Sequence, residues 1–146
     1  MSFLPVYLDS SALLKLVLPE PERPELERVL SRWPDRISSV LLAIECRRAV
    51  HRAGNSPGVL TRLEDEIGTL ALVRLDDTVL RLAGSLGPPD LHSLDAIHLA
   101  TALSCGDHPD AFITYDDRLA AAARALKLNV LQPGRSSRPA GATRGR

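Results

Sequence analysis

The chain has 146 residues, the length of a single domain, and its 45% hydrophobic content is sufficient for a globular core. No apolar run approaches the roughly 20 residues of a membrane-spanning helix, and residues 1–5 lack the features of a signal peptide. We therefore expect a cytoplasmic protein without membrane association. The net charge is zero, but without the four arginines after Pro133 the chain has 14 basic and 18 acidic residues. This balance argues against nucleic-acid binding through bulk positive charge.

Predicted strands and helices alternate along the chain. Short, largely apolar runs predict strands at 6–8, 70–73, 111–114 and 129–131, and a further short strand is predicted at 36–38. Apolar residues at helical spacing predict helices at 12–18, 26–33, 40–53, 60–67, 76–82, 94–103 and 118–126. The alternation predicts an α/β fold with a central, mostly parallel sheet and helices on both of its faces.

The composition changes near the C-terminus. Residues 1–132 form the predicted folded domain, whereas residues 133–146 are rich in Arg, Pro, Gly and Ser and are predicted to be a disordered tail. Cys46 and Cys105 stand alone in separate predicted helices, without C-x-x-C spacing. This arrangement favours two free thiols over a disulfide or a zinc site.

Acidic side chains follow three of the predicted strands. Asp9 ends the first strand, Asp76 follows the strand at 70–73, and Asp116 follows the strand at 111–114. In open α/β sheets, ligands bind beyond the carboxyl ends of the strands. Aspartate is also a preferred N-cap, and Asp9 taken alone is better explained as the start of a helix than as part of a site.

Two further acids lie in apolar helices. Glu45 lies at the edge of the buried face of its predicted helix, and the alternative interpretation is an ion pair with Arg48, three residues further on. Asp95 lies in the first turn of a helix that Ser93 is predicted to cap, where the helix dipole favours a negative charge. Apolar residues flank Asp95 on both sides, which is unusual for an acid that is merely solvated.

These acids suggest a site for a hard cation. If the strands carrying Asp9 and Asp116 are neighbours, their carboxylates meet at one edge of the sheet. Carboxylates within a few ångströms repel each other, and the pKa of at least one rises. Carboxylate oxygens without His or Cys ligands favour magnesium or manganese over zinc. Such ions activate water and stabilise the charge that develops on a phosphodiester.

The segments around these acids carry a resemblance to a known family. They are LDSSAL at 8–13, the apolar helix of Glu45, LDAIHLATA at 94–102 and TYD at 114–116. Together they resemble the PIN-domain nucleases, and most of all the VapC toxins of toxin–antitoxin pairs. The resemblance covers about residues 4–132, and the segment around Asp95 is its most specific part.

The resemblance implies a three-layer PIN-like fold and a Mg²⁺- or Mn²⁺-dependent ribonuclease that hydrolyses phosphodiesters with a metal-activated water. It also implies RNA as the substrate, a homodimer and a VapB-like antitoxin partner. By position, the family's acidic quartet corresponds to Asp9, Glu45, Asp95 and Asp116, with Asp9 and Asp95 as the expected direct metal ligands. The resemblance also implies that Ser11 and Thr114 lie beside the metal and that Asp76 lies outside the site. It leaves open whether Asp117 takes part.

Other interpretations find less support in the sequence. The four histidines lack the paired spacing of a zinc site, and His98 is predicted to be a hydrogen-bonded core residue. Aromatic residues make up only 3% of the chain, so phosphate contacts from Arg47, Arg48 and Arg118 are expected to exceed base stacking. The main alternative is a catalytically silent PIN-like module that binds RNA or a protein partner.

Overall fold

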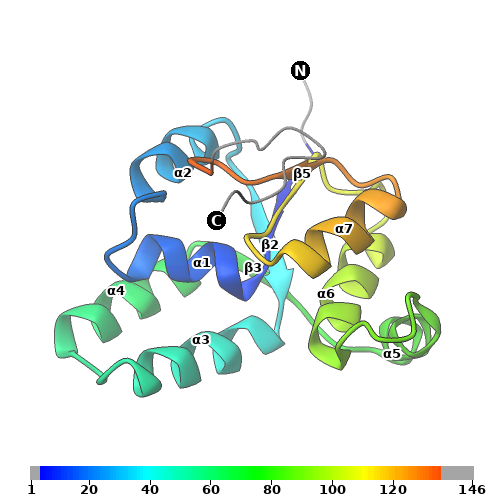
Figure 1. Cartoon of the computed structure of the whole chain (residues 1–146), viewed down its shortest axis with the longest axis horizontal. Coiled ribbons are helices and arrows are strands. Elements are labelled where there is room, and N and C mark those ends of the chain that lie inside the picture. Colours follow the sequence, from blue (N-terminus) through cyan, green and yellow to red (C-terminus); the bar gives the residue numbers. More distant parts are fainter. Residues whose placement is uncertain (1–3, 136–146) are drawn as a thin grey trace, which may run out of the picture.

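Five short parallel strands form the centre of the computed structural model, which describes residues 4–135 (Figure 1). The strands are β1 Val6–Leu8, β2 Arg36–Ser39, β3 Leu70–Val73, β4 Ala111–Ile113 and β5 Val130–Leu131. Their order in the sheet is β3-β2-β1-β4-β5, and every neighbouring pair is parallel. The predicted parallel sheet is confirmed, and all five strands lie within two residues of their predicted bounds.

Seven helices connect and cover the strands of the described chain. They are α1 Ser10–Val17, α2 Arg23–Leu30, α3 Leu41–Arg52, α4 Pro57–Ile67, α5 Asp77–Ser85, α6 Ser93–Ser104 and α7 Asp117–Ala125. Figure 1 shows α1–α4 on one side of the sheet and α5–α7 on the other. The three-layer α/β fold is therefore confirmed.

The central strands are buried on both faces. Val6 and Leu8 contribute to the core beneath α1–α4, whereas Tyr7 points to the opposite face and packs with Leu99 and Phe112. The rings of Tyr7 and Phe112 stack with centroids 5.0 Å apart. A strand covered on both faces has no solvent-facing positions, which explains why the sequence of β1 is entirely apolar or aromatic.

Strand order determines which acids lie near each other. β1 pairs directly with β4, and Leu8 lies opposite Ile113, so the residues that follow these two strands leave the sheet side by side. β3 forms the outer edge of the sheet and is separated from β1 by β2. Asp76, which follows β3, therefore starts α5 at a distance from the residues that follow β1 and β4.

Helix α6 begins differently from the prediction. Ser93 is its first helical residue, and His92 occupies the N-cap position in an extended conformation without a side-chain capping bond. The prediction that Ser93 caps this helix is therefore wrong by one residue. Asp95 nevertheless lies in the first turn, as predicted.

The predicted tail begins with three described residues that contact the domain. Tyr115 Oη donates a hydrogen bond to the carbonyl oxygen of Pro133 at 2.6 Å, and Arg135 pairs with Asp117. Residues 136–146 lie outside the described part of the chain, so the predicted disorder of the tail stays a prediction. No helix among the described residues is long and apolar enough to cross a membrane.

Candidate active site

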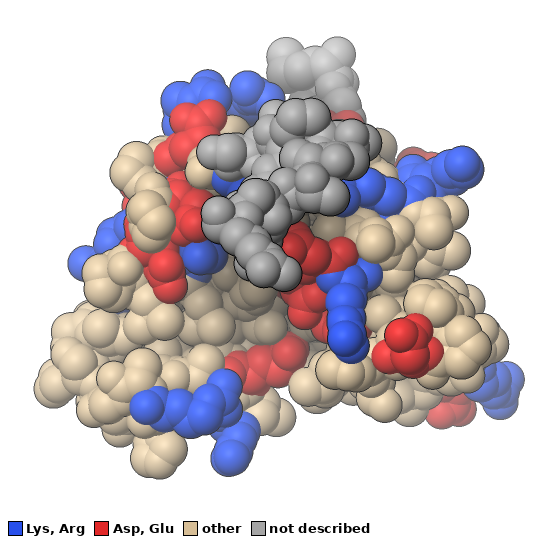
Figure 2. Space-filling model, in the orientation of Figure 1, with Lys and Arg blue, Asp and Glu red and all other residues tan. Residues whose placement is uncertain are grey.

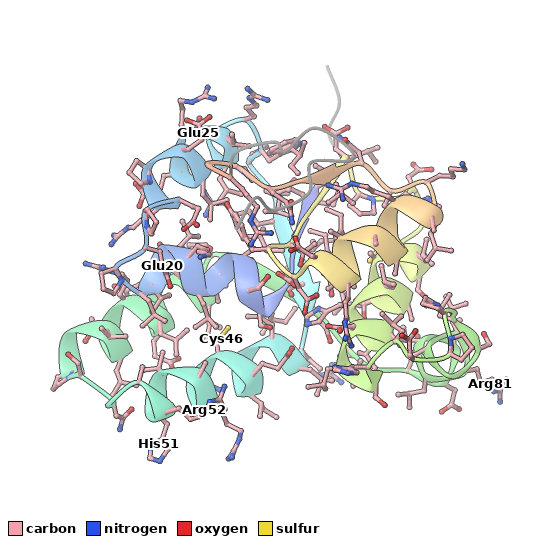
Figure 3. All side chains as sticks on the ribbon, in the orientation of Figure 1. Glu20, Glu25, Cys46, His51, Arg52 and Arg81 are labelled. Atoms are coloured by element: carbon pink, nitrogen blue, oxygen red, sulfur yellow. The ribbon has the colours of Figure 1, made fainter. Side chains whose placement is uncertain are left out.

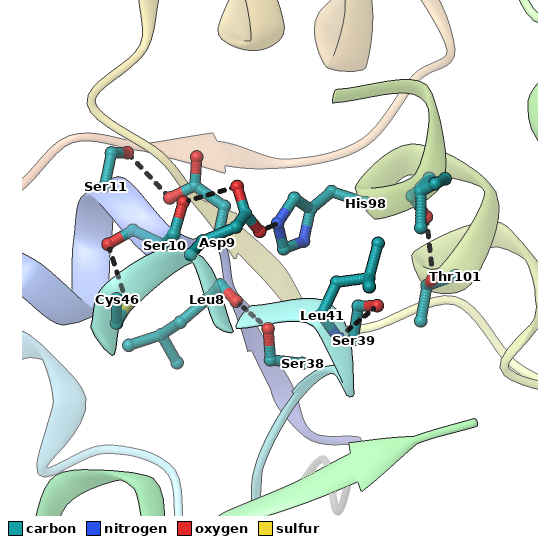
Figure 4. A network of polar contacts seen from close by, with 12 residues as sticks. Leu8, Asp9, Ser10, Ser11, Ser38, Ser39, Leu41, Cys46, His98 and Thr101 are labelled. Carbon is teal, nitrogen blue, oxygen red and sulfur yellow. Dashed lines mark hydrogen bonds and ion pairs between the residues drawn. The ribbon is translucent and has the colours of Figure 1, made fainter. Parts of the chain in front are cut away.

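Asp9 is a buried carboxylate held by three hydrogen bonds. Only 3% of its surface is exposed. Its Oδ1 accepts from the Ala12 amide at 2.9 Å and from Ser11 Oγ at 2.7 Å, while Oδ2 accepts from Thr114 Oγ1 at 2.6 Å (Figure 4 shows the Ser11 contact). Asp9 is thus the N-cap of α1, and it also holds a fixed position at the end of the central strand. Burial raises the pKa of Asp9 more than nearby His98 and the three hydrogen-bond donors lower it.

Two hydroxyls link the end of β1 to the end of β4. Ser11 Oγ lies 3.3 Å from Thr114 Oγ1 and accepts a hydrogen bond from the Tyr115 amide at 2.9 Å. Thr114 Oγ1 in turn accepts from the Asp116 amide at 3.1 Å. The two polar residues predicted by the resemblance therefore contact Asp9 and join its loop to that of Asp116.

Asp116 is the N-cap of α7. Its Oδ1 accepts from the amides of Arg118 and Leu119, at 2.9 and 3.1 Å. As with Asp9, the capping interpretation is correct and does not compete with a role in a site. Because the helix N-terminus carries partial positive charge, capping stabilises a carboxylate at the edge of the sheet.

Asp95 is electrostatically coupled to both strand-end aspartates. It is half-buried, and its side chain forms no hydrogen bond within the described residues. Burial raises the pKa of Asp95, and the negative charges of Asp116 and Asp9 raise it further. The structure therefore brings three members of the predicted quartet into one negatively charged region: strand order places Asp9 and Asp116, and the first turn of α6 adds Asp95.

Glu45 contacts α6 rather than its own helix. Its Oε1 lies 2.7 Å from His98 Nε2, and its Oε2 accepts a hydrogen bond from Ser10 Oγ at 3.1 Å. The alternative ion pair with Arg48 is not formed. Cys46 is the next residue of α3, and its side chain faces α1 (Figure 3). Its Sγ donates to the Ser10 carbonyl oxygen at 3.7 Å. These contacts hold α3 against the start of α1 and direct Glu45 toward the segment that follows Asp9.

Two further acids lie outside this group. The side chain of Asp117 is 84% exposed and forms an ion pair with Arg135 at 2.6 Å. Asp76 is exposed, caps α5 and accepts from the Val79 amide at 2.9 Å. The residue that sequence reasoning missed is His98: it is a buried, hydrogen-bonded histidine as predicted, but its link to Glu45 was not foreseen. His98 follows Asp95 by three residues and so shares its helical face, a signal that could have revealed it.

The chemistry of the donors suits a hard cation. All four quartet members offer carboxylate oxygens, and hydroxyls of Ser10, Ser11 and Thr114 already donate to two of them. Oxygen-only donor sets of this kind favour magnesium or manganese. Among the described residues, no three His, Cys, Asp or Glu side chains already form a metal-binding cluster. Within the site Asp116 and Asp9 repel the charge of Asp95, and a divalent cation would relieve this repulsion.

The comparison with protein families agrees with this arrangement. The PIN domain family model matches residues 6–125, which include all the strands except β5 and all seven helices. The chain belongs to the PIN-domain family.

Several known PIN proteins are similar to this chain. Ribonuclease VapC46 of Mycobacterium tuberculosis is 44% identical over 128 residues, which cover 88% of this chain and 97% of that protein. Ribonucleases VapC47 and VapC35 of the same species are each 38% identical, covering 88% and 90% of this chain and 97% and 98% of their own lengths.

Solved structures show the same fold at lower identity. VapC20 of Mycobacterium tuberculosis, described as a sarcin–ricin loop cleaving toxin, aligns with a TM-score of 0.65 and 13% identity over 80% of this chain and 94% of its own. PAE2754 from Pyrobaculum aerophilum aligns with a TM-score of 0.57 and 19% identity over 87% of this chain and 83% of its own. These two likenesses show that the chain shares its fold with both proteins, while its place in the PIN family rests on the family model.

Replacing Asp95 tests the charge coupling of this PIN domain directly. We expect Asp95→Asn to raise the melting temperature of the EDTA-treated protein at pH 7, because it removes a carboxylate that its neighbours repel. The gain in unfolding free energy should stay below about 1 kcal/mol, since solvent screens a half-buried charge. A raised carboxyl pKa means that the ionised form destabilises the fold, so the gain should disappear at acidic pH, where Asp95 is protonated.

The matched control is Asp76→Asn, an exposed N-cap outside the acidic group, which should change the melting temperature little because asparagine also caps helices. Magnesium should then stabilise wild type and Asp76→Asn more than Asp95→Asn. If Asp95→Asn melts at a lower temperature than wild type in EDTA, Asp95 is only a favourable charge in the first helical turn. That result would contradict its repulsion by Asp9 and Asp116.

Proposed function

We propose that this PIN domain is a divalent-metal-dependent ribonuclease that acts as the toxin of a toxin–antitoxin pair in the cytoplasm. The ribonuclease assignment is supported by its relatives: three PIN proteins named ribonuclease VapC are 38–44% identical to it over nearly their full lengths. The observation in this chain that carries the proposal is geometric: Asp9 and the loop of Asp116 leave paired strands side by side and are joined through Thr114. The charges of Asp116 and Asp9 also raise the pKa of Asp95, in agreement with this grouping.

The four acids have distinct tasks in this proposal. Asp9 and Asp95 would hold Mg²⁺ or Mn²⁺, and Asp116 would contribute its negative charge nearby. When bound, the ion would lower the pKa of a water molecule and offset the charge on the phosphodiester. Glu45, fixed on both carboxylate oxygens by hydrogen-bond donors, would orient the attacking water through its remaining lone pairs. Asp9 keeps its orientation through the donors from Ser11, Ala12 and Thr114.

Two pockets on either side of the acids provide room for RNA. One of about 360 Å³ includes Asp95 and Arg118, and the other of about 300 Å³ includes Glu45, Arg48 and Arg52. Figure 2 shows acidic side chains between the two helix layers and basic side chains over α3. An RNA strand that crosses the acids would therefore meet an arginine on each side, which suits phosphate binding.

The partner proteins implied by the family belong to the same proposal. The pocket next to Glu45 also has apolar side chains in its lining, among them Ile44 and Leu94, which are 57% and 46% exposed. A VapB-like antitoxin that covered these side chains would also block Glu45. The homodimer remains part of this proposal, without a specific contact assigned to it.

The proposal predicts cleavage that depends on both metal and acids. Purified, antitoxin-free protein should cut structured RNA with Mg²⁺ or Mn²⁺ and stop when EDTA is added. Asp9→Asn and Asp95→Asn should each lower kcat by about 10²-fold or more, since each removes a charged ligand of the ion. Asp76→Asn should cleave like wild type.

Cleavage that survives exhaustive chelation would contradict the metal mechanism. Loss of activity in Asp76→Asn with full activity in Asp95→Asn would show that the site lies at the end of a different strand. RNA binding without any cleavage by the metal-loaded protein would support the silent binding module instead.

The two arginines in the pockets beside the acids should contribute to RNA binding, whereas a nearby arginine that is already paired should not. Arg48→Ala and Arg118→Ala should each raise KM and reduce the slope of log affinity against log salt by about 0.7, the value for one phosphate contact on a single strand. Arg47→Ala is the matched control, because Arg47 already makes two hydrogen bonds to Glu64, at 2.9 and 3.0 Å. Equal effects of all three substitutions would indicate a general charge effect rather than contacts beside the site.

A further inference from the structure

A chain of side-chain hydrogen bonds runs from the core of the sheet to Glu45. Tyr7 Oη of β1 lies 2.7 Å from His98 Nδ1 of α6, and His98 Nε2 lies 2.7 Å from Glu45 Oε1 of α3. The Ser39 amide of β2 donates to Tyr7 Oη at 3.1 Å. Figure 4 shows the His98 ring extending from α6 toward the residues that follow β1. Four elements of the fold therefore meet in this chain.

The carboxylate at the outer end indicates the direction of these hydrogen bonds. A carboxylate only accepts, so the proton between His98 and Glu45 belongs to His98 Nε2. In a neutral imidazole that donates through Nε2, Nδ1 is the acceptor, so Tyr7 Oη donates to Nδ1 while it accepts from the Ser39 amide. Hydrogen bonds are thus donated in the order Ser39 to Tyr7, Tyr7 to His98 and His98 to Glu45, with the imidazole in its Nε2–H tautomer.

The hydrogen-bond chain is rigid at its buried end. Tyr7 is fully buried and His98 is 1% exposed. The Tyr7 ring stacks on Phe112, and its edge contacts the His98 ring at a centroid distance of 5.8 Å. Neither ring has room to rotate in this packing. The Glu45 side chain is 19% exposed at the outer end, so the chain connects an immobile core to an accessible carboxylate.

Without this chain of hydrogen bonds, the Glu45 carboxylate would have arginines as alternative partners. Arg48 lies one turn further along α3 and, with Arg52, lines the same pocket. A freely rotating Glu45 would pair with such an arginine, as glutamates three residues from an arginine do on exposed helices. The hydrogen bond from His98 competes with that pairing and directs Oε1 toward α6 instead.

We propose that His98, oriented by Tyr7, is a positioning residue that holds the Glu45 carboxylate in its working orientation. The inference rests on the proposed ribonuclease function and assigns the two residues a role in it. His98 touches neither substrate nor ion in this account, and its effect on cleavage passes through Glu45. Outer hydrogen-bond partners of this kind typically change activity by 10–100-fold when they are removed.

The first test compares substitutions of His98. His98→Leu fills the space without a donor and should lower kcat by about 10–100-fold with little change in KM. His98→Gln retains an N–H donor near the position of Nε2 and should recover most of that loss. Leu99→Val is the matched control: it removes a buried methylene from the next residue of α6, lowers the melting temperature, and should leave kcat unchanged. Tyr7→Phe keeps the stacked ring, removes only the hydroxyl, and should cause a smaller loss of kcat.

The second test asks whether His98 acts through Glu45. In a Glu45→Gln background, His98→Leu should cause no further loss of kcat, because the carboxylate that it positions is already absent. A multiplied loss would overturn the proposal, as would a His98→Leu enzyme with the kcat of Leu99→Val. If wild type cuts RNA and only these results fail, the proposed ribonuclease function stands while the positioning role falls. If wild type does not cut RNA at all, both fall.

A readout independent of activity checks the chain itself. Nitrogen-15 NMR of the metal-free protein should show His98 protonated on Nε2 and unprotonated on Nδ1, and Tyr7→Phe should shift the Nδ1 resonance. An Nδ1–H tautomer in wild type would contradict the direction of the chain and overturn the proposal.

Discussion

The pairing of β1 with β4 is the constraint on which the site depends. Leu8 lies opposite Ile113, so Asp9 and the Thr114–Asp116 loop leave the sheet together. The hydroxyls of Ser11 and Thr114 then join the two loops by donating to the same carboxylate. Burial disfavours the charge of Asp9, and these donors offset part of that cost. The fold thus places an anion at the edge of its own hydrophobic core.

Capping and function are not alternatives in this protein. Asp9 and Asp116 both satisfy the first amides of a helix, and the same geometry holds both carboxylates at the ends of neighbouring strands. Asp95 adds a third negative charge that the other two repel. Asp76 caps its helix in the same way, but β2 separates its strand from β1. Strand order, rather than local chemistry, distinguishes the two capping acids of the site, Asp9 and Asp116, from the third cap, Asp76.

The sequence predicts features that depend on residues close together in the chain, and it does not predict contacts between residues far apart. Strands such as β1 and β3 were predictable because their apolar runs are short and bounded by proline or polar residues. The adjacency of β1 and β4 was only a condition in the sequence argument, since order depends on how crossovers pack. Helical spacing offered Arg48 as the partner of Glu45, whereas the actual partner, His98, is 53 residues away. Periodicity detects neighbours on one helix and cannot detect contacts between two helices.

The central claim is that Asp9 and Asp95 belong to one cation site. Crystals grown with Mn²⁺ and measured for anomalous scattering test it most directly, because the signal locates the ion without an RNA substrate. The account predicts a manganese peak between these two carboxylates in wild type and in Asp76→Asn, and its loss in Asp95→Asn. A peak that persists in Asp95→Asn, or manganese ordered only at the Asp76 end of β3, would contradict it.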